Sequence, residues 1–376
     1  MYIPDASPSR LLEAVDSTPT GDKDIVILLL PEGEKKRIPA IVEAFKARPT
    51  PFVGGFFPAV LHGKQQHDKG AIVLKLPMRR PPTLIQNLDT SVVHLPDLDP
   101  RRDGCAMETC TALILTDAFS SNISTFLAAL FSRLGNGVNY LGGGAGSASM
   151  KQEPCVFCRE GVFQNAALVV FVDYASAFGV RHGWPRLHGP VVATKTRKNV
   201  ICELNWRNAL EVYKDIVERD SGEHIKPKES YELCQVYPFG IFKEGAEDLV
   251  RDTVRITDKG ELVSLGDIPE NTVLHVLKGN PKSLIAAAAQ AAADCADVPT
   301  GAAKQTLIFS CVSRPLFLGK AFVQEMDAVQ TRISEIAAGL EVEGVLSLGE
   351  ISSHGEGLLE LFNKTVVVGL LYDGKA

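Results

Sequence analysis

The chain of 376 residues contains no long hydrophobic run. Its longest apolar stretches span about six to ten residues, whereas a helix needs about twenty apolar residues to cross a bilayer. The first ten residues, MYIPDASPSR, also lack the basic start and apolar centre of a secretory signal. We therefore expect a cytoplasmic protein that does not insert into a membrane.

Cysteine is also sparse, because the eight cysteines are spread over the whole chain and do not form the dense pattern of a small disulfide scaffold. The net charge of −6 argues against a nucleic-acid partner, since such proteins concentrate Lys and Arg on one surface. We expect reduced thiols and no nucleic-acid binding. The length is sufficient for two domains with substantial cores.

What the sequence does contain is one plan that occurs three times. Each copy opens with a short apolar run and continues through an amphipathic helical segment into a second strand-like run. The opening runs are Ile25–Leu30, Thr111–Thr116 and Thr306–Cys311. A strand joined through a helix to the next strand favours a parallel pair with a right-handed crossover. Each copy therefore predicts a parallel strand-helix-strand unit.

The second run of each copy breaks at glycine, within residues 51–59, 138–148 and 343–353. A hairpin and a closing apolar run follow each break, and the hairpin adds antiparallel strands. The pattern predicts an α/β fold with mixed, α+β-like sheets, built from pseudo-symmetric strand-helix-strand-hairpin units that form two domains. A boundary near Trp206 gives an N-terminal domain, 1–205, with two units. The C-terminal domain, 206–376, has one unit and a strand-rich insertion.

The glycine break of the second unit is a candidate ligand-binding turn. In LGGGAGSAS, Gly143 and Gly144 can bring backbone N–H groups close to a ligand, because no Cβ intervenes, and Ser147 follows at the rim. The alternative is that these glycines only allow the chain to turn sharply. No Gly-Lys-Ser or Gly-Lys-Thr follows, so the segment is not a phosphate-binding loop.

The third unit places further polar residues at strand ends, where ligands bind in open α/β sheets. Cys311 and Arg314 follow its first strand, and Glu350 follows its glycine break. The Arg314 guanidinium is suited to a carboxylate or phosphate. Glu350 could pair with Arg314 or with a ligand amine. The alternative is a structural Arg–Glu pair that braces the turn.

Motifs for catalysis and for metal binding are absent. There is no Gly-x-Ser-x-Gly and no His-Glu-x-x-His. Cys155 and Cys158 form a Cys-x-x-Cys, but the segment predicts a strand, on which side chains three positions apart face opposite ways. We expect no metal. Two alternatives stay open, namely His182 as a ligand of haem iron and Cys311 or Cys158 as a nucleophile.

The same motifs resemble those of the FIST family, named for F-box and intracellular signal transduction proteins. GGFFPA, LGGGAGSAS and the stretch from HGWP to ICELNWRNALEVY are similar to its N-terminal domain. YPFGI, LIFSCVSRPLFLG and GVLSLGEISS resemble its C-terminal domain. The resemblance covers nearly the whole chain. The chain departs from the family at Ser147, where an acidic residue is common.

The resemblance implies a sensory, ligand-binding module of cytoplasmic signalling that is not an enzyme. A chain without a kinase, cyclase or F-box segment would pass its signal to a separate partner. One branch of the family consists of haem proteins that sense nitric oxide and regulate histidine kinases. The resemblance therefore also implies an alternative in which haem is the cofactor, His182 its ligand and a histidine kinase the partner. The family motifs include Gly143, Gly144, Cys311, Arg314 and Glu350.

Overall fold

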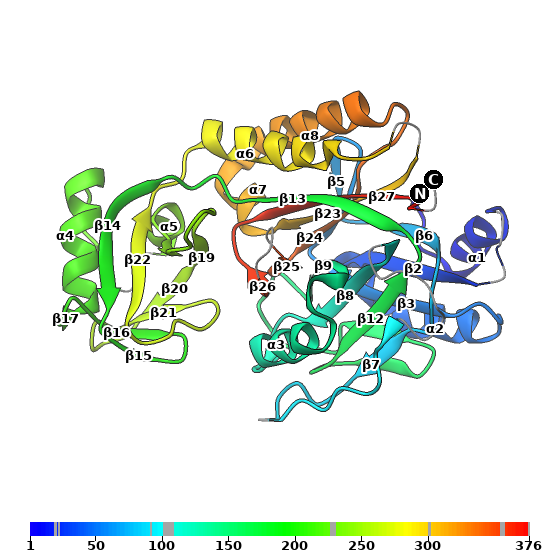
Figure 1. Ribbon diagram of the computed structural model, residues 1–376, viewed down its shortest axis with the longest axis horizontal. Helices are drawn as coiled ribbons and strands as arrows, with labels where there is room; N and C mark the ends of the chain where they lie inside the picture. The colour runs from blue at the N-terminus through cyan, green and yellow to red at the C-terminus, as the bar shows by residue number, and fades with distance from the viewer. Residues whose placement is uncertain are drawn as a thin grey trace.

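The computed structural model describes residues 1–18, 21, 23–90, 92–100, 109–225, 231–299, 302–353 and 358–374. It consists of a large body and a smaller lobe that extends from one side of the body (Figure 1). The body holds three six-stranded sheets, and the lobe holds a four-stranded and a five-stranded sheet. In the described part of the chain, no helix has the length and apolarity that crossing a membrane requires.

Each sheet of the body is built around one of the three repeated units. The first unit consists of β2 (Asp24–Pro31), α2 (Ile38–Lys46), β3 (Phe52–Phe57) and β6 (Ala71–Pro77). The second consists of β8 (Thr111–Asp117), α3 (Ile123–Leu134), β9 (Asn139–Ala145) and β12 (Ala167–Val172). The third consists of β23 (Ala303–Cys311), α8 (Phe322–Ile336), β24 (Glu343–Ser347) and β27 (Val366–Tyr372). In every unit the first strand pairs parallel with the second and antiparallel with the last. The predicted mixed α/β fold with pseudo-symmetric units is confirmed.

The hairpin of each unit joins the sheet of another unit. The hairpins are β4 (Ala59–His62) with β5 (Gln65–His67), β10 (Val156–Cys158) with β11 (Gly161–Phe163), and β25 (Glu350–Ser353) with β26 (Leu359–Phe362). The first pairs with β24 of the third unit, the second with β3 of the first unit, and the third with β9 of the second unit. The three units therefore interlock in a closed cycle, which the sequence repeat did not predict.

Apolar faces explain why the helices pack where they do. Ile38, Ile41, Val42 and Phe45 recur at helical spacing on α2, and all four are buried. Burying each of these side chains contributes roughly 1.5–3 kcal/mol. On the other side of the body, α6 (Pro281–Ala293) lies along α8, and both cover the sheet of the third unit (Figure 1). The 3₁₀ turn Asp294–Ala296 follows α6 directly.

Further elements complete the body. These are β1 (Tyr2–Ile3), α1 (Pro8–Asp16), the 3₁₀ helix Glu32–Arg37, β7 (Thr83–Ile85), the 3₁₀ turn Gly135–Gly137, β13 (Ala175–Arg181), α7 (Ser313–Leu318) and the 3₁₀ turn Gly319–Ala321. Strand β13 pairs with β27, so the second unit leads directly into the sheet of the third unit.

The lobe is the chain between β13 and α6. Its elements are β14 (Arg186–Ala193), β15 (Lys195–Arg197), β16 (Val200–Leu204), β17 (Arg207–Asn208), α4 (Ala209–Ser221), α5 (Tyr231–Val236), β18 (Phe239–Ile241), β19 (Leu249–Arg251), β20 (Thr253–Ile256), β21 (Leu262–Ser264) and β22 (Thr272–Leu277). Helix α4 begins at Ala209, because the Asn208 side chain caps it by accepting from the Leu210 N–H. The expected boundary between 1–205 and 206–376 falls inside this lobe, between the paired strands β16 and β17.

Candidate functional site

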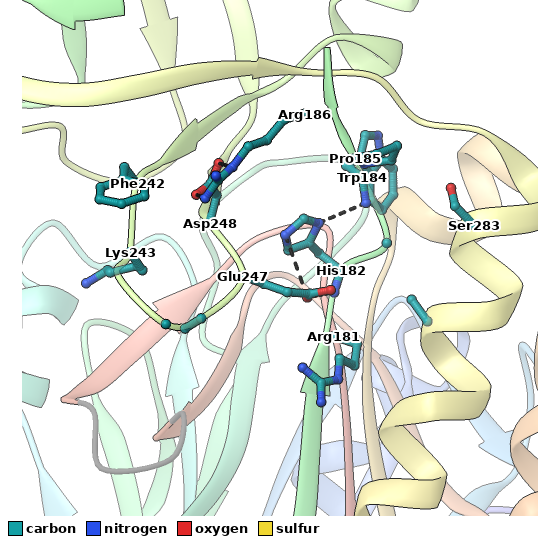
Figure 2. A pocket seen from close by; sticks show the side chains of 14 residues that line it. Arg181, His182, Trp184, Pro185, Arg186, Phe242, Lys243, Glu247, Asp248 and Ser283 are labelled. Atoms are coloured by element: carbon teal, nitrogen blue, oxygen red, sulfur yellow. Dashed lines mark hydrogen bonds and ion pairs between the residues drawn. The ribbon is translucent and has the colours of Figure 1, made fainter. Parts of the chain in front are cut away.

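The largest described cavity lies where the lobe meets the body. Its volume is about 890 Å³, and three segments line it: residues 181–186 where β13 leads into the lobe, residues 242, 243 and 245–248 between β18 and β19, and the first turns of α6 (Figure 2). The chain passes between lobe and body at residues 182–185 and again at 278–280. The cavity is therefore a cleft beside the two connections that join the halves of the molecule.

His182 lies at the centre of this cleft and is held in one tautomer. Its Nδ1 accepts a hydrogen bond of 2.8 Å from the Trp184 N–H, and its own backbone N–H donates to Glu247 at 2.9 Å (Figure 2). Burial lowers the pKa of His182, so the ring is neutral and its single proton lies on Nε2. That N–H is 3.6 Å from a Glu247 oxygen, and no described residue accepts a hydrogen bond from it.

This geometry does not fit the haem alternative. A histidine that ligates a metal donates its other ring N–H to a protein acceptor, which leaves a lone pair on the ligating nitrogen. In His182 the bond runs the other way, because Nδ1 is the acceptor and Nε2 carries the proton. Binding iron through either nitrogen would break the bond from the Trp184 N–H or remove the only ring proton. We derive no haem chemistry for this chain.

Most charges of the cleft are paired within the protein. The Arg186 guanidinium bonds both oxygens of Asp248, at 3.0 and 2.7 Å, and Lys243 pairs with Glu360 at 2.8 Å. Arg181 pairs with Asp294 at 2.7 Å. Glu247 has only the backbone and ring N–H groups of His182 beside it in the described structure. The cleft is therefore polar, with one incompletely neutralised carboxylate facing an unused imidazole N–H.

Arg314 lies directly behind the cleft and is completely buried. Its Nε and Nη2 bond Glu325 of α8 at 2.9 and 2.8 Å, and its remaining donors bond the backbone carbonyls of His182, Lys364 and Leu284 at 2.6, 2.9 and 3.0 Å. All five guanidinium N–H groups are thus used. The expected carboxylate partner Glu350 is replaced by Glu325, because α8 brings its first turn over the end of β23. A ligand could reach Arg314 only by displacing one of these partners.

A second buried cation, Lys364, connects lobe and body. Its ammonium is 3.2 Å from an Asp252 oxygen in the lobe and 5.1 Å from the centroid of the Trp184 ring. Burial raises the pKa of Asp252, and the Lys364 charge opposes that shift. Sequence reasoning missed Lys364, Asp252 and Glu247 altogether. Of the residues in this group, only Trp184 belongs to a motif that the sequence analysis identified, HGWP.

The predicted glycine turn lies inside the body. Gly143 and Gly144 belong to β9, and the Gly144 N–H donates to the Gly349 carbonyl at 2.8 Å. A Cβ on Gly144 would lie 2.6 Å from the Leu348 carbonyl oxygen, and one on Gly143 would lie 2.9 Å from Ser347 Cβ. Glycine is therefore required here for the close approach of the second and third units. The alternative interpretation expected a sharp turn at these glycines, but they lie within a strand, and their ligand-binding role stays a prediction.

Glu350 is the register partner of Gly143, and its carboxyl group also interacts with the Cys311 side chain. Glu350 accepts from Ser347 Oγ at 2.8 Å and from the Thr365 N–H at 3.3 Å. Burial raises the pKa of Glu350 to about 8. Ser147 lies apart from this group and donates to Glu32 at 2.5 Å. None of the six predicted ligand-binding residues lines any of the four described cavities.

The two candidate nucleophiles lie in environments that suppress their chemistry. Burial, with a smaller contribution from Glu350, raises the pKa of the Cys311 thiol to about 12, and burial raises that of Cys158 to about 12 as well. Because the thiolate is the reactive form, a raised pKa leaves little of either thiol in that form at neutral pH. The described residues include no group of three His, Cys, Asp or Glu side chains placed to hold a metal ion.

Both thiols should therefore resist alkylation in the native state. We expect iodoacetamide at pH 7.5 to modify Cys311 and Cys158 more than about tenfold more slowly in folded protein than in guanidinium-unfolded protein. Peptide mass spectrometry over a time course would measure the two rates, with Cys202, the least buried described cysteine, as the internal reference. Fast modification of Cys311 in folded protein would contradict the expectation and revive the cysteine-dependent enzyme.

Fold and cleft together define a two-lobed α/β protein with a polar cavity between its lobes. The family model for the FIST N domain matches residues 81–207, and that for the FIST C domain matches residues 209–353. The chain belongs to the FIST family, whose domains are sensory domains of signal transduction. The two matches meet within the lobe, and the first structural unit lies before residue 81, where the N-domain match begins. No curated protein matches the chain.

Proposed function

We propose that this protein is a cytoplasmic, non-enzymatic sensor that binds a small polar ligand in the cleft between lobe and body and signals through a separate partner protein. The observation that carries the proposal is the arrangement of His182 and Glu247. An imidazole N–H without an acceptor and a carboxylate from the opposite wall face each other in the cleft. A ligand with both an acceptor and a donor group, such as an amino acid or a related zwitterion, would satisfy both.

The contacts across the junction support a sensory role. Lys243–Glu360, His182–Glu247 and Lys364–Asp252 each join a residue of the lobe to one of the body or of the connection. Polar junctions of this kind allow domains to move relative to one another. Arg314 donates to the His182 carbonyl and, through its other N–H groups, also bonds α6, α8 and the Lys364 carbonyl. Closure of the cleft on a ligand would therefore be transmitted into the body through the Arg314 network.

The ligand-binding roles predicted for Gly143, Gly144, Ser147, Cys311, Arg314 and Glu350 stay predictions, because none of these residues lines the cleft. The Cys311 backbone N–H donates to the Thr365 carbonyl, and the Glu350 carboxylate accepts from the Thr365 N–H, so a shift of Thr365 would reach both residues. A cytoplasmic location is supported by the described cysteines, among which no disulfide is formed. A histidine kinase is one candidate partner, on the basis of the family resemblance.

Ligand-dependent stabilisation tests the proposal. Among a panel of amino acids and other small zwitterions, we expect at least one compound to stabilise the protein by about 2.7 kcal/mol at a hundred times its dissociation constant. Glu247→Gln should weaken that compound at least about tenfold, because a charge-assisted hydrogen bond is replaced by a neutral one. Thermal unfolding with and without each compound measures both effects.

Glu244→Gln is the matched control, since Glu244 is exposed in the same loop and does not line the cleft. It should leave the stabilisation unchanged. A panel without any stabilising compound would contradict the sensor proposal. Equal loss of the stabilisation in Glu247→Gln and Glu244→Gln would show that the compound does not bind at Glu247.

A further inference from the structure

A second cavity lies next to the loop between β18 and β19 that lines the cleft, since Lys243 of that loop lines both cavities. It has a volume of about 500 Å³ and lies where α3 of the body, the lobe strands β18 and β19, and β26 meet. Both α3 and β19 pack against β26. Its walls are mainly apolar, with Leu127, Ala128 and Phe131 from α3 facing Leu249 and Leu359 from the strands. The size is that of pockets that enclose a small organic ligand.

One buried cation, Arg251, lines this apolar cavity. Its side chain belongs to a residue that is only 7% exposed, and its hydrogen-bond acceptors are all neutral. Nε donates to the Asp267 carbonyl at 3.1 Å, and Nη1 donates to the carbonyls of Val250 and Leu361 at 3.1 and 3.3 Å. Among the residues that the structure describes, none accepts a hydrogen bond from Nη2, and no carboxylate lies within ion-pair distance of the guanidinium.

Such a charge is unusual, because buried cations are normally paired with an anion. Burial lowers the pKa of Arg251 to about 10, and the more distant carboxylates of Glu360 and Asp267 oppose that shift only in part. At the rim, Lys243 and Glu360 neutralise each other at 2.8 Å. Asp267 also lines the cavity, but no described carboxylate forms an ion pair with Arg251, so the guanidinium is a buried cation among mainly apolar walls without a directly bonded anion.

We propose that this cavity is a second ligand site, which binds an amphipathic monocarboxylate with its carboxylate on Arg251 and its apolar chain between α3 and the strands. The carboxylate would accept from Nη2, the one nitrogen of Arg251 that donates to no described residue. The chain would be covered by Leu127, Phe131 and Leu249. Because the walls come from both body and lobe, the ligand would hold the lobe in its position against α3. This site shares Lys243 with the lining of the polar cleft, but the proposed contacts do not involve that residue.

Isothermal titration calorimetry with decanoate, octanoate and decan-1-ol tests the proposal on the full chain, below the concentrations at which these compounds aggregate. Decanoate should bind at one equivalent. Shortening the chain to octanoate should weaken binding on the order of tenfold, because two buried methylenes are lost. Decan-1-ol should bind at least about tenfold more weakly than decanoate, because it lacks the charge that pairs with Arg251. Equal binding of decanoate and decan-1-ol would overturn the proposal.

Two variants locate the site. Arg251→Lys should weaken decanoate at least about tenfold and leave decan-1-ol unchanged, because lysine cannot reproduce the fixed guanidinium geometry. Ala128→Phe keeps Arg251 and fills the cavity from α3, so it should abolish decanoate binding even if the Arg251 variant does not fold. Thr125→Phe is the matched control, since it adds the same ring on the same helix away from the cavity lining.

Thr125→Phe and Glu247→Gln should both bind decanoate as the unaltered protein does. Unchanged decanoate binding by Ala128→Phe would overturn the proposed location. Loss of decanoate binding in Glu247→Gln would do the same, because it would assign the compound to the polar cleft.

Discussion

Arg314→Met should lower the free energy of unfolding by roughly 3–5 kcal/mol, the range observed when one partner of a buried ion pair is removed. The substitution leaves the Glu325 carboxylate, which is 1% exposed, buried without its cation. It also removes the donors to the carbonyls of His182, Lys364 and Leu284. Urea unfolding monitored by circular dichroism measures the loss.

The double variant Arg314→Met with Glu325→Met separates the two causes. Because it removes both charges, it should recover a substantial part of the lost stability, and the difference gives the coupling between the two side chains. Arg332→Met is the matched control on α8, since Arg332 pairs with Glu335 at 2.7 Å on an exposed face and should cost less than about 1 kcal/mol. An Arg314→Met protein as stable as the control variant would refute the structural role of Arg314.

Stability should also fall as the pH rises through neutrality, because of Glu350. Its pKa in the folded protein is raised from 4.5 to about 8. Below pH 4.5 the carboxyl is protonated in both the folded and the unfolded protein. Between pH 4.5 and 8 the unfolded chain ionises while the folded protein keeps its proton, so folding loses free energy with increasing pH. Each pKa unit corresponds to about 1.4 kcal/mol, which makes the total loss on the order of several kcal/mol.

Glu350→Gln should remove this pH dependence, because glutamine resembles the neutral carboxyl and cannot ionise. We expect the variant to be more stable than the unaltered protein at pH 9 and to show a flatter profile between pH 5 and 9. Chemical unfolding at several pH values measures both profiles. Glu335→Gln on the exposed face of α8 should retain the slope, and a Glu350→Gln profile parallel to that of the control would contradict the raised pKa.

The three units could be predicted because their signals are local. Phe45 and its neighbours on α2 recur at helical spacing, and the first strand of each unit is an uninterrupted apolar run. The sheet that each hairpin joins could not be predicted, because neither turn residues nor periodicity specify a partner distant in sequence. Strand β10, for example, pairs with β3 and not with a strand of its own unit.

The candidate site was less predictable than the fold. His182 was identified as a candidate, but its role as hydrogen-bond acceptor from Trp184 is visible only in three dimensions. The sequence does contain a signal for Glu325. This charged residue lies on the apolar stripe of α8 between Phe322 and Val329 and is buried with them. A charged residue at such a position needs a buried partner, and Arg314 was the cation already suspected nearby.

The closed cycle of hairpins also determines the order in which the protein can be completed during synthesis. The β4–β5 hairpin ends at His67, but the strand that it pairs with, β24, begins only at Glu343. At ribosomal rates of roughly 5–20 residues per second, the edge of β4 stays unpaired for tens of seconds before β24 has been synthesised. Exposed strand edges pair readily with other chains. The nascent protein therefore exposes this edge of its first unit until its last unit emerges.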